Sequence, residues 1–340
     1  MSGFDGATAP ASTGPDGLGL VPLRRLLIAG PRLDLAIEPG DRVAVVPGTA
    51  VRAGELLVER IRDPHLVDGG APADEPVSPG EWVAAGEHRR GGASAAGELL
   101  LVARGRLRLV AGSHPDRLEA PVRGQVIGVR PGAAVELAVD GVGFAASELL
   151  GDPVRGRLVI LPAEGDTRPA LDVNLAGMIV AFPGRVDAET LIRARAMGIH
   201  GAVVVSLAER ERRALAESEA RQRAGLHRLA PFGVLLLDGD LRRPLAGPFA
   251  AILAALSGRE VGLAAEPPLL VAGRSIEGLP VPAADRVRLR GGPDVGAEGR
   301  WLGPAGPRRF TPGIQVEAGL VETDDGRLLV VPLGDIERFG

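Results

Sequence analysis

The sequence contains no cysteine, no lysine and no tyrosine, and aromatic residues make up only 3% of it. Without cysteine, the chain has no disulfide, no thiolate nucleophile and no cysteine-ligated metal. Without lysine, it has no amine that could carry biotin, lipoate or pyridoxal phosphate, and no lysine for a phosphate-binding P-loop. We therefore expect no cofactor, and lysine-linked carrier chemistry is excluded.

The remaining composition is that of a chain built from short structural elements. It has 340 residues, of which 45% are hydrophobic and 24% charged, and its 49 glycines and 29 prolines favour many turns. This length predicts two or three domains. The formal net charge of −4 gives no overall attraction to nucleic acid or anionic lipid. No uncharged apolar stretch approaches the roughly 18 residues of a transmembrane helix, so we expect no membrane partner.

The first twenty residues, MSGFDGATAPASTGPDGLGL, combine small residues and proline with two acidic residues. They lack the basic start and the apolar run of a signal peptide. We therefore expect residues 1–20 to form a disordered tail and the protein to be cytoplasmic.

Residues 21–157 predict an all-β domain, because short apolar runs lie between turn signals. The stretch EPGDRVAVVPGTAVRAGELL begins with a Pro-Gly turn and ends in Ala-Gly-Glu-Leu-Leu, and residues 78–100 repeat both features. Together with the later segment EAPVRGQV, this pattern resembles the barrel-sandwich hybrid fold of biotinyl and lipoyl carriers, which also occurs in non-carrier domains. The resemblance implies a barrel-sandwich-like fold without the carrier function, since the attachment lysine is missing. Residues 62–96 predict a loop-rich insertion.

The hydrophobic period changes over residues 158–272, which predict a small parallel α/β domain. Apolar runs suited to buried strands alternate with helical segments, the first of which has Asp187 as its N-cap and Gly198 as its stop. This order implies a parallel sheet with helices on its faces. The strands are expected at 177–182, 201–206, 232–238 and 260–265, and the helices at 187–198, 207–225 and 248–256.

In such a sheet, a ligand binds beyond the carboxyl ends of the strands. A glycine just before a helix N-terminus and a nearby arginine could hold a small anion, and two aspartates could hold a hard cation. The same residue types are also ordinary caps and turn formers, and we favour that interpretation because no nucleotide-binding or nucleophile motif accompanies them. The candidate residues are Gly184, Arg185, Ser206, Asp238 and Asp240.

After a linker at residues 273–280, residues 281–340 predict a partly open barrel of about five short strands. In the motif DRVRLRGGPDVGAEGRW, arginines alternate with Val287 and Leu289, so the arginines share the exposed face of a strand and the aliphatic residues face a core. The motif resembles the KOW motif of transcription-elongation factors and ribosomal proteins. The order of domains is also similar to that of an uncharacterised group of KOW-containing proteins from Chloroflexota-type bacteria, which implies no activity.

The KOW resemblance implies binding of RNA or of protein. Arginines and aromatic residues favour RNA, but the domain also carries nine acidic residues, so it has no net basic field. We therefore place protein binding ahead of RNA binding. The candidate partner-binding residues are Arg286, Arg288, Arg290, Arg300, Trp301, Arg308, Arg309 and Phe310.

The sequence thus predicts a multidomain α+β protein with an all-β barrel-sandwich-like domain, a small parallel α/β domain and a small KOW-like β-barrel. The leading hypothesis is a non-enzymatic interaction or scaffold protein whose protein partner is unidentified. One alternative is an RNA-, ribosome- or transcription-associated factor. The other is an enzyme or regulator that binds a small anion or a metal at the strand ends. The oligomeric state stays open.

Overall fold

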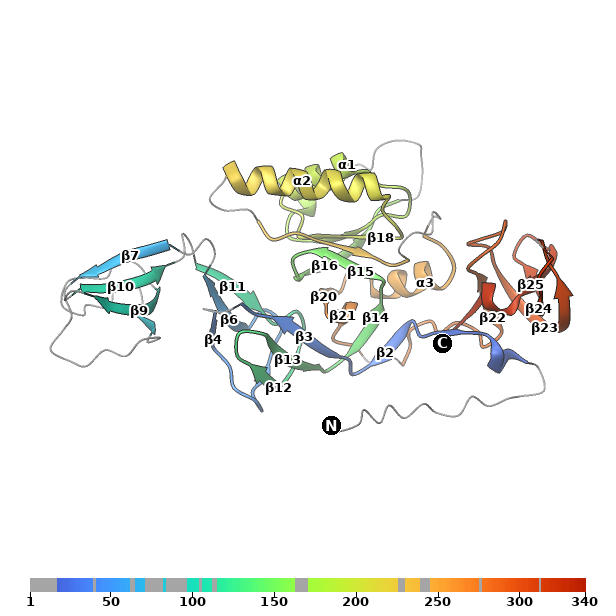
Figure 1. Ribbon diagram of the computed structural model, residues 1–340, viewed down its shortest axis with the longest axis horizontal. Coiled ribbons are helices and arrows are strands. Elements are labelled where there is room, and N and C mark those ends of the chain that lie inside the picture. Colours follow the sequence, from blue (N-terminus) through green and yellow to red (C-terminus); the bar gives the residue numbers. More distant parts are fainter. Residues whose placement is uncertain are drawn as a thin grey trace.

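A mixed sheet of nine strands forms the centre of the part of the chain that the structure, a computed structural model, describes (Figure 1). The described residues are 17–38, 41–61, 65–70, 82–83, 97–103, 106–111, 115–162, 171–225, 230–238, 245–274, 277–311 and 313–340. The strand order in this central sheet is β15 (Glu148–Gly151), β19 (Gly233–Leu236), β18 (Gly201–Val204), β17 (Ile179–Ala181), β16 (Val154–Ile160), β20 (Glu260–Ala265), β21 (Pro268–Ala272), β14 (Val142–Ala145) and β2 (Leu27–Ala29).

The middle of the central sheet is the parallel unit that the sequence predicts, with one correction. Strands β16, β17, β18 and β19 are parallel neighbours. The expected fourth parallel strand at 260–265 is β20, which instead pairs antiparallel with β16. The chain therefore completes the parallel unit with β16, whose residues 157 and 158 lie on either side of the expected domain boundary.

Helices cover both faces of the parallel strands, as expected from their buried, continuous apolar sequences. Alternate residues of β17, β18 and β19 pack against the two faces, so Val180 shares a core with one set of helices and Ile179 with the other. Asp187 accepts a hydrogen bond from the Thr190 amide at 2.8 Å, which confirms it as an N-cap. The helices are α1 (Ala188–Ala196) and α2 (Glu209–Gly225) on one face, and α3 (Gly247–Leu256) on the other.

Two smaller sheets formed by the first part of the chain share one apolar core beside the central sheet. Leu35, Leu57 and Leu137 lie in this core, and Leu269 and Val271 of β21 join it from the central sheet. We call these two sheets the sandwich, and neither is closed. One has the order β3 (Arg32–Ala36), β13 (Ala134–Val139), β12 (Gly124–Arg130) and β5 (Ala50–Val51), and the other has the order β11 (Pro115–Glu119), β6 (Leu56–Ile61) and β4 (Arg42–Val43).

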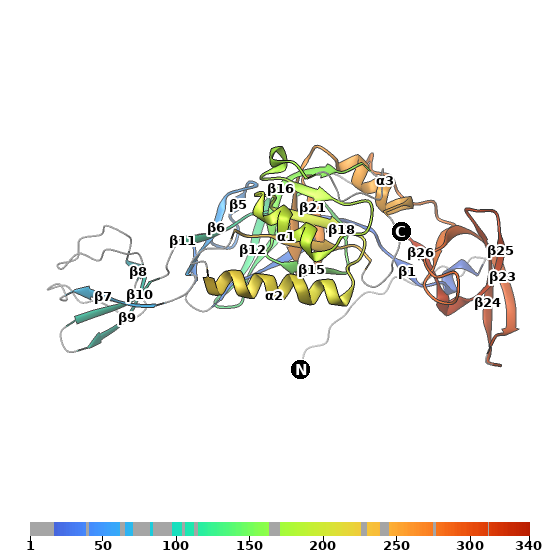
Figure 2. The ribbon, with the colours of Figure 1, turned by 90° about the horizontal axis from the view of Figure 1, so that it is seen from above.

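A further sheet is inserted between β6 and β11. Its strands are β7 (His65–Gly70), β10 (Arg106–Ala111), β9 (Gly97–Ala103) and β8 (Trp82–Val83), in that order. Strands β7 and β8 lie inside the segment expected to be loop-rich, and they correct that expectation for their own residues. Both views place the inserted sheet and the C-terminal sheet at opposite ends of the molecule (Figure 1, Figure 2).

The C-terminal residues form an open sheet of six described strands, which we call the C-terminal sheet. Its order is β1 (Leu23–Arg24), β26 (Ile336–Phe339), β22 (Arg286–Leu289), β23 (Glu298–Arg309), β24 (Gln315–Thr323) and β25 (Leu328–Pro332), with the 3₁₀ turn η3 (Leu333–Asp335) before β26. Val287 and Leu289 are 0% and 1% exposed in its core, as their alternation predicts. Strands β26 and β1 were not expected from the sequence.

The beginning of the chain completes the C-terminal sheet. Strand β1 pairs in parallel with β26, and Val21 is 2% exposed in the core of this sheet. The 3₁₀ turn η1 (Leu18–Leu20) lies against β23. Residues 17–20, expected to belong to a disordered tail, are therefore part of the fold, whereas residues 1–16 lie outside the described residues. In the expected linker, Leu279 is buried in the central core.

Candidate functional site

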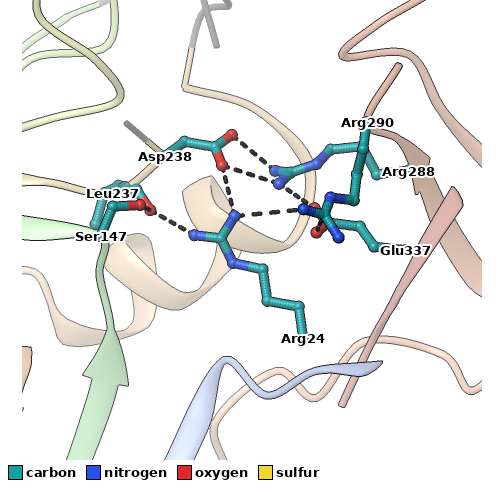
Figure 3. Close-up of polar contacts among 7 residues, drawn as sticks. All are labelled: Arg24, Ser147, Leu237, Asp238, Arg288, Arg290 and Glu337. Atoms are coloured by element: carbon teal, nitrogen blue, oxygen red, sulfur yellow. Dashed lines mark hydrogen bonds and ion pairs between the residues drawn. The ribbon is translucent and has the colours of Figure 1, made fainter. Parts of the chain in front are cut away.

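Asp238 follows β19 at the carboxyl edge of the parallel strands, and its side chain is only 2% exposed. A buried carboxylate is stable only when charged or hydrogen-bonding groups surround it. Arg288 of β22 supplies a bidentate contact, with its Nη1 at 2.8 Å from Oδ2 and its Nη2 at 2.9 Å from Oδ1 (Figure 3). Two predicted sites, the strand ends and the arginine-rich strand, are thus the two halves of one contact.

Arg24 of β1 is the second cation on Asp238. Its Nη1 lies 2.5 Å from Oδ1 of Asp238, and its Nη2 donates at 2.5 Å to the Leu237 carbonyl. The Ser147 hydroxyl donates to the same carbonyl at 3.1 Å. Arg24 therefore ties the N-terminal strand to the end of β19 through side-chain and backbone acceptors together.

Glu337 of β26 brings the second carboxylate. It lies directly opposite Arg288 in the register of β26 and β22, and the two side chains form an ion pair. Nη1 of Arg24 is 3.8 Å from Oε1 of Glu337, and Nε of the half-exposed Arg290 is 3.6 Å from Oε2. We call Arg24, Asp238, Arg288 and Glu337 the ion cluster, in which two positive charges balance two negative charges.

Aromatic rings close the ion cluster on its apolar side. The guanidinium carbon of Arg288 lies 5.5 Å from the ring centre of Phe249 and 5.3 Å from that of Phe339. Arg24 lies 5.1 Å from the ring centre of Phe249. These contacts are cation–π interactions, and the rings also exclude water, which strengthens the ion pairs and makes any unpaired member costly.

The arginines of the motif strand do not form the exposed row that the alternation predicts. Arg288 is 1% exposed, because Asp238 and Phe249 cover the face of β22 that it occupies. These two residues belong to the central sheet and its helices, which we call the central unit. The prediction of three arginines on an exposed strand face is therefore wrong. The alternation gave the correct face of the strand, but it contained no information about what packs on that face.

Arg286 is held by two carboxylates, with its Nη2 2.9 Å from Glu298 and 2.6 Å from Asp324. Burial lowers the pKa of Arg286, but the hydrogen bonds to Asp324 and Glu298 outweigh burial and hold the pKa above its usual value. Glu298 also touches the first turn of α3, where any side chain on Gly247 would collide with its carboxylate. A carboxylate at a helix N-terminus is electrostatically favourable, so Glu298 forms a second contact between α3 and the C-terminal sheet.

The other partner-binding candidates divide between the interior and an exposed hairpin. Trp301 is 6% exposed and packs over Gly319, so its ring cannot stack on a base. Arg300 pairs with Glu322 at 2.9 Å. Arg308 and Arg309 are exposed near the β23–β24 turn, beside the half-buried Phe310.

The strand-end candidates do not assemble into a ligand site among the described residues. Gly184 and Arg185 are exposed and Ser206 is half-buried, while Asp240 lies outside the described residues. The N-terminus of α1 is already occupied, because the amides of Thr190 and Ala188 donate to the carboxylates of Asp187 and Glu211. Within the described ranges, no group of three or more histidine, aspartate or glutamate side chains is placed to hold a metal ion.

Hollows in the described part of the chain lie elsewhere, and the sequence did not indicate them. A groove of about 600 Å³ separates the sandwich from the amino ends of the parallel strands, at the edge opposite to the predicted site. There His200 Nδ1 is 2.9 Å from the Arg155 carbonyl, and Arg155 Nε is 3.1 Å from Glu119. A second hollow of about 410 Å³ lies beside β15 and α2, where Arg212 donates to Glu148 at 2.6 Å.

Sequence reasoning missed Arg24 and Glu337. Arg24 is separated from Asp238 by 214 positions, so no local spacing connects them. Glu337 lies in the sequence IERF, whose alternation of apolar and charged residues is typical of a strand. That signal could have located β26, but it could not have identified the partner of the carboxylate.

Comparisons with known proteins give no match: no family model matches the chain, and neither a curated protein nor a solved structure matches it. None of the helices in the described part of the chain is long and apolar enough to cross a membrane.

Proposed function

We propose that this protein is a non-enzymatic interaction scaffold, in which the C-terminal sheet is fixed to the central unit and presents its outer surface to a protein partner. The observation that carries this proposal is an exposed apolar patch beside the open edge of that sheet. Cytoplasmic location, the KOW-like character of the sheet and the barrel-sandwich-like character of the sandwich are parts of the same proposal.

The apolar patch consists of Leu302, Leu320, Leu328 and Val330. Leu320 and Val330 are direct cross-strand neighbours, and Leu328 shares the face of Val330 two residues away. Leu328 is 63% exposed, Val330 44% and Leu302 42%. Strand β25 ends the described strand order, so its outer edge is open. Apolar side chains grouped at an open strand edge are typical of a protein-binding surface.

The ion cluster supports the scaffold part of the proposal. It joins β1, the end of β19, β22 and β26, which come from both ends and the middle of the chain. Asp238, a strand-end carboxylate that the sequence offered as a cation ligand, is bound by two guanidinium groups there. The ion cluster at the carboxyl edge is therefore suited to holding the C-terminal sheet against the end of β19.

RNA binding is the second candidate, because Arg308, Arg309 and Phe310 are grouped on one hairpin. A basic side chain that contacts phosphate must not already be neutralised, and Arg286, Arg288 and Arg300 are ion-paired within the fold. Trp301 is buried. The arginines left for phosphate are few, which favours a protein partner.

The test compares affinity purification of the intact chain from its native host with that of two variants. In the first, Leu328→Asp and Val330→Asp place charges in the apolar patch. In the matched control, Val46→Asp and Ile127→Asp change two exposed apolar residues of the sandwich, which are 67% and 38% exposed. Unfolding temperatures are measured first, so that only folded proteins are compared.

We expect specific protein partners to be captured by the intact chain and by the control, and to be lost from the patch variant. Recovery of the same proteins with all three chains would contradict the proposed surface. Recovery of RNA in place of protein would favour the second candidate.

A further inference from the structure

The distal part of the β23–β24 hairpin extends beyond the rest of the C-terminal sheet. Strand β22 pairs with β23 only at residues 298–300, and β25 pairs with β24 only at residues 318–322. Residues 307–309 and 315–317 pair only with each other. We call the described residues 307–311 and 313–317 the arm (Figure 2 shows β23 and β24 at the outer end of the sheet). A two-stranded segment that extends in this way is exposed on both faces.

One face of the arm combines apolar side chains with a cation. Arg308 and Val316 are direct cross-strand neighbours, and the Phe310 amide donates at 2.9 Å to the Ile314 carbonyl, which continues the ladder by one pair. Because residues two apart share a strand face, Arg308, Phe310, Ile314 and Val316 lie on the same side. Ile314 is 59% exposed and Val316 36%.

The arm is also where arginine charges stay uncompensated. Among the described residues, Arg308 and Arg309 form no ion pair, although Arg309 Nε donates to the Gly313 carbonyl at 3.1 Å. The one acidic residue of the arm, Glu317, lies opposite Pro307, so it shares the other face of the arm with Arg309 and leaves Arg308 without an acidic neighbour on its own face. Nearer the sheet body, Glu322 and Asp324 are already bound by Arg300 and Arg286.

The base of the arm is supported by the beginning of the chain. Gly17 lies against the ring of Pro304, and η1 contacts β23. Two irregularities in the register, after Trp301 and after Pro304, set the course of β23 toward the arm. A braced base reduces the ordering that binding must impose, which favours a surface that is ready to bind.

We propose that this face of the arm binds an acidic, apolar segment of a partner protein. Carboxylates of the segment pair with Arg308, and its apolar side chains pack on Phe310, Ile314 and Val316. The inference rests on the proposed function and names the chemistry of the partner. RNA fits the face less well, because a single arginine provides few phosphate contacts and two branched aliphatic side chains offer no stacking surface.

The test is a fluorescence anisotropy titration of the full chain with labelled twelve-residue probes. The first probe is a peptide that alternates glutamate and leucine, the second replaces glutamate with glutamine, and the third is an oligouridine RNA. The variants are Arg308→Gln and Ile314→Ser. The control is Arg309→Gln, which makes the same charge change on the other face of the arm.

We expect the glutamate peptide to bind the unaltered chain and the control equally. Arg308→Gln should weaken binding severalfold, and Ile314→Ser should also weaken it. The glutamine peptide should bind at least tenfold more weakly to the unaltered chain, which tests the charge without any substitution in the protein. No binding of the glutamate peptide, equal binding of both peptides, or tighter binding of the RNA that Arg308→Gln abolishes would each overturn the inference.

Failure of this inference is distinguishable from failure of the proposed function. In the host purification, the glutamate peptide should displace the captured partners, and the Arg308→Gln variant should not capture them. If the intact chain captures specific partners that the Arg308→Gln variant retains, the arm inference is wrong while the scaffold proposal stands. If the intact chain captures no protein, the proposed function fails, whatever the peptide titration shows.

Discussion

The ion cluster and the arm place the same residue type in opposite surroundings. Arg288 is 1% exposed, contacts two carboxylates and lies over two aromatic rings. Arg308 is exposed and has an aliphatic neighbour across the hairpin. Both arginines belong to strands of the C-terminal sheet. The role of an arginine here is therefore set by what packs on its strand, and the comparison separates arginines that fasten the fold from arginines that remain available to a partner.

The largest effect is expected from Asp238→Asn. The change leaves Arg24 and Arg288 beside a neutral group in a site that excludes water, so the free energy of unfolding should fall by about 3–5 kcal/mol. Chemical denaturation of the full chain measures it. Asp140→Asn, which breaks an exposed pair with Arg123, is the control and should cost no more than about 1 kcal/mol. If Asp238→Asn and Asp140→Asn lower the free energy of unfolding by equally small amounts, the ion cluster is no different from ordinary surface ion pairs.

A smaller loss of stability is expected from Val21→Ala. Val21 is 2% exposed in the core of the C-terminal sheet, although it lies at the other end of the chain. Loss of two buried methyl groups should lower the free energy of unfolding by about 1.5–3 kcal/mol. Hydrogen exchange of the backbone amides of β26, with which β1 pairs, should be faster in the variant than in the unaltered chain. Unchanged protection of β26 would mean that the N-terminal strand does not complete this sheet in solution.

Arg300→Ala should lower the stability less than Val21→Ala does. Arg300 and Glu322 form an ion pair on the surface of the C-terminal sheet, with side-chain exposures of 61% and 41%. Exposed pairs contribute roughly 0–1 kcal/mol, and salt screens them. The expected change in denaturation midpoint is therefore small at low salt and smaller at high salt. A loss as large as that of Asp238→Asn would contradict the division between buried and exposed arginines.

The smallest effect concerns pH. A hydrogen bond from Thr323 and contacts with Arg327 hold the pKa of Asp325 below its usual value. A lowered pKa contributes stability that is present above the pKa of the unfolded chain and is lost as the pH falls through the folded-state pKa. Asp325→Asn should therefore lower the unfolding midpoint slightly at neutral pH, and this difference should disappear in acid. If the difference in unfolding midpoint between the two proteins grows in acid, the lowered pKa of Asp325 does not explain it.

Local patterns predicted the elements well where the governing interactions are local. Asp187 capped α1, and Val287 and Leu289 entered a core as their alternation indicated. Patterns failed where distant parts of the chain meet. The direction of β20 is that of its antiparallel pairing with β16, which lies far earlier in the chain, and the burial of Arg288 depends on Asp238, fifty positions earlier. Strand β1 is two residues long, so its sequence carries almost no signal of its own.

The candidate site shows the same limit. Asp238 and Arg288 were both singled out from the sequence, one as a cation ligand or turn former and the other as a partner-binding residue. Neither interpretation anticipated that the two side chains would form an ion pair with each other. Arg308, Arg309 and Phe310 were also singled out, and they remain candidates because the described fold leaves the two arginines exposed.

The most direct test of the central claim is a double-mutant cycle between Asp238→Asn and Arg288→Met, measured by chemical denaturation of the full chain. If the ion cluster fastens the C-terminal sheet to the central unit, the double variant should be more stable than the sum of the single losses predicts, with a coupling of at least about 2 kcal/mol. Additive losses, with a coupling below about 0.5 kcal/mol, would show that the two side chains are energetically independent and would contradict the account.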